Sequence, residues 1–513
     1  MAERRRQCLL LIAILVASTL LRFLLCARGG QYFLNDEQRY DRGISLYVAA
    51  LNGDTAHARE VLALPEHPLF PWLGAAVTAM QRPFASLVGR GDWGHHPENI
   101  AFSIWIGACL LSLFSSLNIL LVALVARRLG AGWGEALWSA LLMAVSNTAL
   151  YYSRHLVPYD AAICAGLTSL LLGLGGRSNA RVFLSGILAC SVFLLYNGYW
   201  FLPPVVGLLF LRSWKGDPDI RAKAVAFALG GAAIAAAVFL IGTWAGGGEY
   251  WRIMGAFSHT VTQGLFSEGW SLPWEYFWNS EGCLGAVVVA LIACAWVSSS
   301  RLGRPRASRL VFGLAGAALV YALLVVFSVG LNFFVVYGRT VKPIVPFLCI
   351  AGGCALAQLL GERRTIRILV ATGFVAGGIL MAVPHFTFIF PREVEVYVLR
   401  NFGNPKRTLS VSGSIYIPLA VPVGRPDLAL VNDQILYPIK DFIGYPEGRT
   451  LFSVENVLDY RPFQYEGHTP RQRKILRDRD ISVRLILLAH PETVPNDLPF
   501  ALRNQTRPDG RGS

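Results

Sequence analysis

The sequence predicts an all-α polytopic membrane protein with about eleven transmembrane helices and a small C-terminal α/β domain outside the membrane. Of its 513 residues, 54% are hydrophobic and only 15% are charged, whereas a soluble chain carries about 25% charged residues. The mean hydropathy is +0.47, and long apolar runs recur over the first three quarters of the chain. Intrinsic disorder is excluded because disordered segments are poor in apolar residues. A soluble multidomain enzyme is excluded because it would expose too much apolar surface to water.

A membrane-spanning helix needs about 20 mostly apolar residues. The segments predicted to span are 7–27, 100–126, 134–151, 159–175, 182–196, 199–211, 224–245, 283–299, 310–329, 343–360 and 366–384. The pair 182–196 and 199–211 is ambiguous, because polar residues and prolines break an apolar run that is long for one helix and short for two. The stretch 67–90 is apolar but interrupted by prolines, and we expect an interfacial helix there.

Basic residues set the predicted orientation, because cytoplasmic loops of membrane proteins carry an excess of Lys and Arg. Arg4, Arg5 and Arg6 precede the first span, so we expect a cytoplasmic N-terminus. Every even-numbered span then leads into a basic loop on the same side. The predicted cytoplasmic segments hold 18 Lys and Arg against four acids. This excess equals the net charge of +14 of the whole chain, so the charge requires no nucleic-acid partner.

The predicted topology divides the chain into a transmembrane domain, 1–385, and an extracytoplasmic domain, 386–513. Two large extracytoplasmic loops of the transmembrane domain, 28–99 and 246–282, are expected to be catalytic. In the C-terminal domain, the predicted strands are 408–412, 415–421, 427–432 and 482–488, and a basic helix is predicted at 470–479. All nine cysteines fall in or beside predicted spans, so the sequence implies neither a disulfide framework nor a CxxC metal site.

Two adjacent carboxylates, Asp36 and Glu37, follow the first predicted span. They can belong to a capped juxtamembrane helix, since Asp is a good N-cap and acids are favoured in a first turn. They can also be catalytic, because partial desolvation at the lipid–water boundary raises a carboxyl pKa towards the range of a general base. The sequence leaves both interpretations open.

Two further groups of polar residues lie at outer ends of predicted spans. Arg154 and Asp160 flank the outer turn before the fourth span, and Arg339 and Lys342 precede the tenth. A carboxylate at the depth of Asp160 normally faces a cavity or a partner, although it can also be a helix cap. Arg339 and Lys342 are suited to bind a lipid phosphate or to anchor the helix by reaching the headgroups.

The loop 246–282 contains several Trp residues, among them Trp270, together with His259 and Glu268. Aromatic rings interleaved with polar groups suit sugars, which offer apolar faces and hydroxyl edges. An interfacial aromatic belt explains the same composition. Walker A, GxGxxG, HExxH and GxSxG motifs are absent from the sequence.

Taken together, these pieces resemble the polytopic glycosyltransferases of the GT-C class, near the bacterial branch of RgtA/B/C/D-like proteins and lipid A aminoarabinose transferases. Protein O-mannosyltransferases are more distant relatives. The resemblance covers about residues 1–385 and rests on order and spacing. Its pieces are Asp36-Glu37 and Tyr40 after the first span, His67-Pro68-Leu69-Phe70-Pro71, Arg154 to Asp160, and Gly338-Arg339-Thr340 with Pro343 and Pro346.

The resemblance implies an enzyme in the bacterial cytoplasmic membrane that takes a sugar from a polyprenyl-phosphate-type carrier and transfers it, with inversion, to an extracytoplasmic lipid, glycan or protein. Asp36 would be the general base and Glu37 its support. Asp160 matches the second acidic position, Arg339 would bind the carrier phosphate, and Lys342 would assist it. Expected substrate contacts also include Tyr40, His67, Arg154, His259, Glu268 and Trp270. Relatives often carry Lys or Tyr where this chain has His67, and Tyr where it has Thr340, so the donor pocket differs.

Metal dependence stays open, because two adjacent carboxylates can hold a divalent ion or act without one. An alternative function is a transporter or flippase of lipid-linked saccharides, which predicts charged residues deep inside several spans. A third is a structural or sensory membrane protein whose working part is the domain 386–513.

Overall fold

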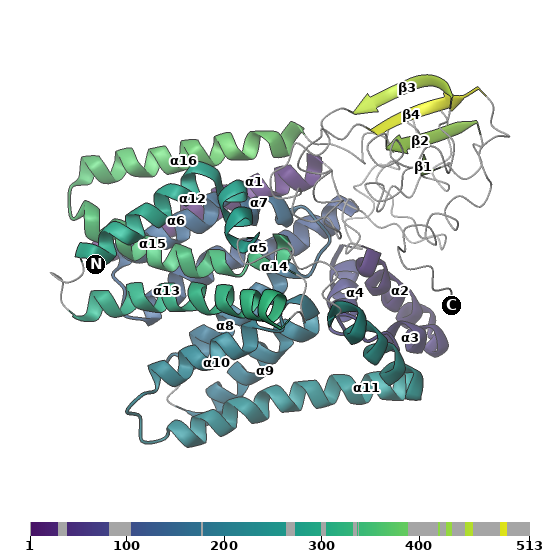
Figure 1. Cartoon of the computed structure of the whole chain (residues 1–513), viewed down its shortest axis with the longest axis horizontal. Coiled ribbons are helices and arrows are strands. Elements are labelled where there is room, and N and C mark those ends of the chain that lie inside the picture. Colours follow the sequence, from purple (N-terminus) through teal and green to yellow (C-terminus); the bar gives the residue numbers. More distant parts are fainter. Residues whose placement is uncertain are drawn as a thin grey trace.

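The computed structural model describes residues 2–28, 38–81, 104–175, 178–262, 272–298, 304–331, 336, 338–387, 419–420, 427–432, 447–454 and 483–489. Its helices form a bundle whose long members run roughly side by side (Figure 1). Four short strands lie beyond the end of the bundle that is opposite to the N-terminus (Figure 1).

The helices of the bundle and of the segments beside it have the following bounds. They are α1 (Ala2–Arg28), α2 (Gln38–Asn52), α3 (Thr55–Leu62), α4 (Phe70–Gln81), α5 (Ile104–Arg128), α6 (Trp133–Val145), α7 (Asn147–Ser153), α8 (Tyr159–Gly173), α9 (Asn179–Leu195), α10 (Leu202–Ser213), α11 (Ile220–Thr262), α12 (Leu272–Ser298), α13 (Arg304–Val325), α14 (Gly338–Val341), α15 (Ile344–Leu360) and α16 (Arg364–Thr387).

A helix occupies each of the eleven segments predicted to span the membrane. Seven helical stretches are long and apolar enough to cross a bilayer, in α1, α5, α11, α12, α13, α14–α15 and α16. The other four segments hold the shorter helices α6, α8, α9 and α10. The predicted class, a helical polytopic membrane protein, is therefore confirmed, while the number of eleven crossings stays a prediction.

The ambiguous region 182–211 forms a helical hairpin. α9 ends at Leu195, a single 3₁₀ turn covers Asn197–Tyr199, and α10 begins at Leu202 with proline in its first turn. The indole of Trp214, just after α10, donates a hydrogen bond of 3.2 Å to the carbonyl of Gly173 at the end of α8. The chain therefore turns back at Asn197–Tyr199, between α9 and α10.

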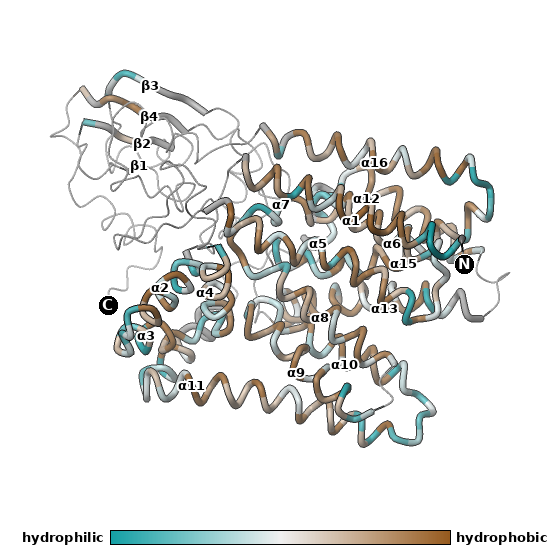
Figure 2. The backbone as a smooth tube through the Cα atoms, turned by 180° about the vertical axis from the view of Figure 1, so that it is seen from behind, coloured by the Kyte–Doolittle hydropathy of each residue, from teal (hydrophilic) through white to brown (hydrophobic). Residues whose placement is uncertain are grey.

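Glycines allow α9 and α11 to pack closely. A Cβ atom added at Gly230 would lie 2.0 Å from the carbonyl oxygen of Phe183, and one added at Gly186 would lie 2.0 Å from that of Phe227. Small residues at such crossings let membrane helices approach through their backbones. α11 otherwise presents apolar side chains outward, among them Leu240, which is 70% exposed. Apolar residues follow the helices along their length, and polar residues gather at the ends (Figure 2).

Basic residues meet at the end of the bundle that holds the N-terminus. Arg309 of α13 donates to the carbonyl of Gly130, in the turn between α5 and α6, at 2.6 Å. It also forms an ion pair of 3.0 Å with Glu135 of α6. Hydrophilic segments lie at this end (Figure 2). This clustering agrees with the alternation of basic loops, while the assignment of this side to the cytoplasm stays a prediction.

Within 386–513, the described residues form one antiparallel sheet with the order β1-β2-β4-β3. Its strands are β1 (Leu419–Ala420), β2 (Leu428–Asn432), β3 (Gly448–Val454) and β4 (Val483–Leu488). β1, β2 and β4 fall on three predicted strands. β3 was not predicted, and a bulge between Thr450 and Phe452 interrupts its alternation. The segments 408–412 and 470–479 lie outside the described residues.

We expect Gly230→Ala to loosen the α9–α11 contact, because its methyl group meets a backbone carbonyl that cannot rotate away. Overpacking of this kind costs about 1–3 kcal/mol, which thermal unfolding in detergent would register as a lower midpoint. Gly255→Ala, in the part of α11 that follows a kink at Gly247, is the control because an added Cβ there meets nothing within 4 Å. Equal midpoints for the two variants would contradict the packing argument.

Candidate functional site

A buried ion pair joins two of the predicted site residues. Lys342 follows the single turn of α14, and its Nζ lies 2.8 Å from Oδ1 of Asp160 in the first turn of α8. The two residues are 1% and 5% exposed. Asn118 of α5 donates from Nδ2 to the backbone oxygen of Asp160 at 3.0 Å and to Oδ1 at 3.3 Å. Asp160 is thereby held in place by two other segments of the chain.

This pairing indicates what Asp160 does in the structure. A buried carboxylate that touches an ammonium group stabilises the cation and is stabilised by it, because both have lost their contact with water. Asp160 therefore positions Lys342 and offsets its charge. Its predicted place among the catalytic residues, as the second acidic position, stays a prediction.

Tyrosine rings surround this pair and extend away from it. The Nζ of Lys342 lies 5.0 Å from the ring centroid of Tyr152, within the range of a cation–π interaction. Tyr152 contacts Tyr159 edge to face at 5.3 Å, and Tyr159 contacts Tyr196 in the same way at 4.7 Å. The rings lead from α7 and α8 to the turn after α9.

Arg339 lies at the far end of this row of rings. Its Nε donates a hydrogen bond of 2.8 Å to the hydroxyl of Tyr196. The hydroxyl of Tyr199 donates to the backbone oxygen of Arg339 at 2.9 Å. Arg339 is 6% exposed. The turn between α9 and α10 therefore fixes both the side chain and the backbone of Arg339, and it brings two buried cations to one tyrosine cluster.

His67 joins the same cluster from the segment before α4. Its imidazole ring is 4.9 Å from that of Tyr196. Its backbone N–H donates to Oδ1 of Asn197 at 2.7 Å, and the backbone N–H of Asn197 donates to its Nδ1 at 3.0 Å. Because Nδ1 accepts this bond, the ring proton of neutral His67 resides on Nε2. Its φ of 49° is unusual outside glycine and is typical of functional sites.

Arg154 is also buried, but it belongs to a different chain of polar groups. Its Nη1 donates to the backbone oxygen of His385, in α16, at 2.9 Å. The imidazole of His385 in turn lies 2.5 Å from Oδ1 of Asn147, and the backbone N–H of Asn147 donates to Glu281 of α12 at 2.9 Å. Arg154 therefore ties the connection between α7 and α8 to α12 and α16.

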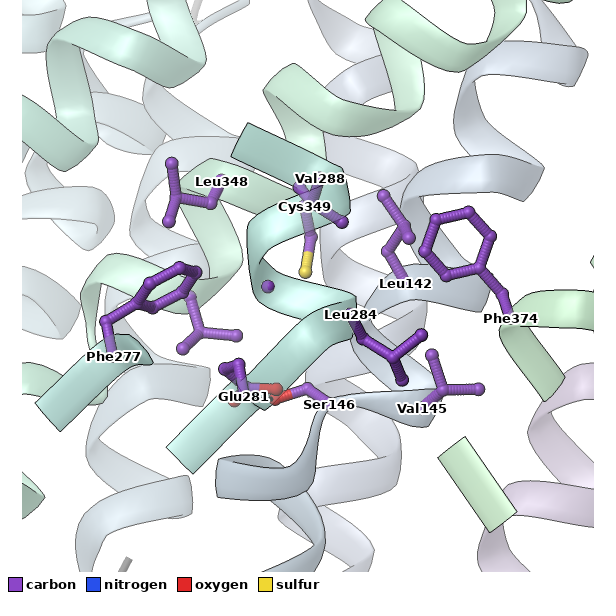
Figure 3. Close-up of a pocket in the computed structure, with 12 residues that line it drawn as sticks. Leu142, Val145, Ser146, Phe277, Glu281, Leu284, Val288, Leu348, Cys349 and Phe374 are labelled. Carbon is purple, nitrogen blue, oxygen red and sulfur yellow. Dashed lines mark hydrogen bonds between the residues drawn. The ribbon is translucent and has the colours of Figure 1, made fainter. Parts of the chain in front are cut away.

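Glu281 lines a small cavity between α6, α12, α15 and α16 (Figure 3). Its carboxylate accepts hydrogen bonds from the hydroxyl of Ser146 at 2.8 Å and from the backbone N–H of Thr148 at 3.0 Å. Apolar side chains, such as Leu284 and Phe374, form most of the wall, and the volume is about 30 Å³. Such a volume holds about one water molecule. Glu281 therefore acts as a cap for α7, and the cavity is too small for a sugar.

Tyr40 lies on α2 and belongs to a second buried cluster. It is 1% exposed and packs near Phe70 of α4, with ring centroids 6.5 Å apart. Burial raises the pKa of its phenol well above the ordinary value, so the hydroxyl stays protonated. Leu156, in the connection between α7 and α8, belongs to the same cluster. Tyr40 is thus close to the segment that carries Arg154 and Asp160.

The structure brings Asp160, Lys342, Arg339 and His67 together around the tyrosines. The other predicted residues Asp36, Glu37, Glu268 and Trp270 lie outside the described residues, as does the side chain of His259. Among the residues that the structure describes, no group of three or more His, Cys, Asp or Glu is placed to hold a metal ion. A metal at Asp36 and Glu37 therefore stays untested.

The groups that hold the cations in place are not evident from the sequence. Tyr152, Tyr159, Tyr196 and Tyr199 were not predicted because tyrosines at span ends are typical of an interfacial belt. Asn118, in the middle of an apolar helix, was the clearest indication in the sequence of a buried polar contact, since a buried amide requires hydrogen-bond partners. Arg22 is another case: it is fully buried in α1 and donates from Nε to the hydroxyl of Ser115 at 3.0 Å.

The chain matches no protein-family model and no curated protein. Solved structures of membrane glycosyltransferases of the GT-C class align with it. A crystal structure of ArnT from Cupriavidus metallidurans bound to undecaprenyl phosphate is 14% identical, with a TM-score of 0.46 over 79% of this chain and 74% of that chain. The oligosaccharyltransferase AglB from Archaeoglobus fulgidus, in complex with an inhibitory peptide and a dolichol-phosphate, is 14% identical, with a TM-score of 0.41. That alignment covers 75% of this chain and 55% of AglB. Alignments with TM-scores this low do not allow residue roles to be transferred from those proteins to this chain.

We expect Lys342→Met to destabilise the fold strongly, because Asp160 would remain buried without its cation. Breaking one side of a buried ion pair costs about 3–5 kcal/mol. The double variant Lys342→Met/Asp160→Asn should recover a large part of the loss, since no unpaired charge remains. Thermal unfolding of the purified membrane protein measures both. A single variant as stable as the unaltered protein would show that the pair is not required.

Proposed function

We propose that the chain is a membrane glycosyltransferase that moves a sugar from a polyprenyl-phosphate-type lipid carrier to an extracytoplasmic acceptor, with inversion. The acceptor is a lipid, a glycan or a protein. The observation that carries the proposal is the convergence of Arg339 and Lys342, two buried cations, on one tyrosine cluster at the outer end of the bundle.

The charges of the cluster support a phosphate as its ligand. Arg339 and Lys342 together exceed the single carboxylate of Asp160 that contacts Lys342, so the cluster favours an anion. Guanidinium groups bind phosphate through paired hydrogen bonds, and an ammonium adds a compact charge. The hydroxyl of Tyr196 orients the guanidinium. Because these groups lie at the end of apolar helices, a phosphate attached to a long apolar chain suits them best.

In the proposed reaction, Asp36 removes a proton from the nucleophile of the acceptor, and Glu37 supports it. The nucleophile attacks the anomeric carbon from the face opposite to the phosphate, so the configuration inverts. The bond between the anomeric carbon and the phosphate oxygen breaks, and the carrier phosphate leaves with the bonding electrons. Arg339, assisted by Lys342, stabilises the charge that develops on this phosphate. The roles of Asp36 and Glu37 come from the resemblance to the GT-C class.

His67 and the predicted residues Tyr40, Arg154, His259, Glu268 and Trp270 complete the proposed substrate contacts. His67 is a proposed substrate contact because its imidazole lies beside Tyr196 in the same cluster as Arg339. Arg154 contributes by holding the connection between α7 and α8, which it ties to α16. The tyrosine rings supply apolar faces for a sugar.

The positions of the charges favour an enzyme over the alternative transporter. In the seven long helical stretches that the structure describes, charged side chains lie within two helical turns of an end. A transporter of charged carriers is expected to place ionisable groups near the middle of the membrane. We propose the bacterial cytoplasmic membrane as the location, with the active face and the C-terminal domain outside.

Asp36→Asn tests the proposed base. We expect sugar transfer from a labelled polyprenyl-phosphate sugar to fall by at least about 100-fold in kcat, because general-base catalysis contributes about 10²–10⁴. Asp54→Asn is the control, since Asp54 is an exposed cap of α3 whose Oδ1 accepts from the backbone N–H of His57 at 2.9 Å. Retained transfer in Asp36→Asn would remove Asp36 from the mechanism.

Arg339→Gln tests the phosphate site. We expect its KM for the polyprenyl-phosphate donor to rise and its kcat to fall by about 10²–10³, as for other groups that stabilise a developing charge. Steady-state kinetics at varied donor and fixed acceptor separate the two effects. Kinetics equal to those of the unaltered enzyme would place the carrier phosphate elsewhere.

A further inference from the structure

Two side chains beside the ion-pair site carry buried polar atoms whose hydrogen bonds are not made. Gln81, the last residue of α4, and Tyr40 of α2 are each 1% exposed. Among the described residues, neither Nε2 nor Oε1 of Gln81 has a hydrogen-bond partner, and the hydroxyl of Tyr40 makes no hydrogen bond of good geometry, although the side chain of Thr78 lies next to it. Buried polar groups in native proteins almost always find partners, so such a group calls for a bound water or ligand.

The hydroxyl of Tyr40 and the side-chain amide of Gln81 both lie next to Gly107 of α5. A Cβ atom added at Gly107 would lie 2.9 Å from the hydroxyl of Tyr40 and 3.5 Å from Oε1 of Gln81. Thr78, one turn before Gln81 on the same face of α4, is fully buried, and its hydroxyl donates to the backbone oxygen of Gly74 at 2.8 Å. Two helices, α2 and α4, therefore direct polar atoms against the backbone of α5 at Gly107, where a side chain would collide with them.

The chemistry of this group differs from that of the cation cluster. Tyr40, Thr78 and Gln81 carry no charge, and burial keeps the phenol of Tyr40 protonated by raising its pKa. Phenol and amide groups donate and accept hydrogen bonds, which matches hydroxyl groups rather than phosphate. Neutral polar side chains in an apolar setting are typical of sites that bind carbohydrates and other uncharged ligands.

The position of the group relates it to the proposed reaction. The Cβ added at Gly107 would also lie 3.5 Å from Cδ2 of Leu156. Leu156 belongs to the connection between α7 and α8, which carries Arg154 and leads into Asp160. The group is therefore separated from the ion pair by one short segment of chain. Tyr40 follows Asp36, the proposed base, by four residues in sequence.

We propose that Tyr40, Thr78 and Gln81, over Gly107, form a hydrogen-bonding subsite for the uncharged hydroxyl groups of a carbohydrate substrate. The subsite deepens the proposed function and depends on it. The cation cluster then binds the phosphate and the Tyr40–Gln81 group binds hydroxyls, so the two substrate parts are recognised by separate groups of residues. The hydroxyls belong either to the donor sugar or to a glycan acceptor.

Gln81→Leu is the central test, because it removes both unpaired polar atoms and keeps the size of the side chain. An unpaired buried amide does not help the free protein, so the thermal midpoint should stay equal or rise. The KM for the hydroxyl-bearing substrate should rise at least about tenfold, since sites built to bind hydroxyls lose affinity when that pairing is removed. Tyr40→Phe should act in the same direction. Gly107→Ala should obstruct the subsite.

Matched controls separate this effect from loss of polarity elsewhere. Tyr250→Phe removes a buried hydroxyl that also lacks a partner among the described residues, but on α11. Gln358→Leu removes an amide of α15 whose Nε2 donates to the carbonyl of Ala295 at 3.2 Å. Both controls should leave the KM values unchanged.

The substrate whose KM rises in Gln81→Leu identifies the ligand of the subsite. A rise in the KM for polyprenyl-phosphate hexoses assigns the subsite to the donor sugar, and a rise in the KM for a glycan acceptor assigns it to the acceptor.

Equilibrium binding distinguishes a wrong subsite from a wrong function. Bare polyprenyl phosphate should bind the unaltered protein and Gln81→Leu equally, whereas polyprenyl-phosphate mannose, glucose, galactose or aminoarabinose, or the glycan acceptor, should bind Gln81→Leu more weakly. Absence of any sugar transfer by the unaltered protein would refute the proposed function. Unchanged KM values and unchanged binding of sugar-bearing carriers and acceptors in Gln81→Leu and Tyr40→Phe would refute the subsite and leave water as its occupant.

Discussion

The buried contact between Lys342 and Asp160 is the constraint on which the arrangement of the site depends. A charge inside a helical membrane protein cannot be solvated by lipid, so the fold must bring its partner to it. Asp160 starts α8, Lys342 follows α14, and Asn118 of α5 holds the carboxylate from a third side. Once these three segments meet, Tyr152 and Tyr159 stand beside the ammonium group, and the remaining rings extend to Arg339.

The turn between α9 and α10 also fixes the arrangement of the site, in this case through hydrogen bonds. Tyr196 and Tyr199 hold Arg339, while Asn197 holds His67 in a left-handed conformation that costs free energy without such support. A short break in a helical hairpin therefore connects His67, from the segment before α4, with Arg339 of α14. Irregular backbone at membrane depth is tolerated where protein surrounds it, and here it organises the site.

The sequence predicts the helical membrane class and the positions of the helices well, because the cost of exposing polar groups to lipid makes apolar runs diagnostic. It also singles out Asp160, Arg339 and Lys342, since charges at span ends are rare enough to be noticed. It does not predict which charges meet. The pair of Lys342 with Asp160, and the support of Tyr196 for Arg339, depend on how distant helices pack, and no local pattern encodes that. The strand β3 was missed for a local reason, since its bulge disturbs the alternation.

The ion pair also has a consequence for the order in which the chain assembles during synthesis. Asn118 and Asp160 emerge early and close together in sequence, whereas Lys342 follows only after α9, α10, α11, α12 and α13 have been made. Until then, the amide of Asn118 is the partner that α5 offers to the carboxylate within the bilayer. Arg22 of α1, which is made earlier still, also interacts electrostatically with Asp160. The late part of the chain therefore supplies the cation that contacts Asp160 directly, while the early helices already hold a more distant one.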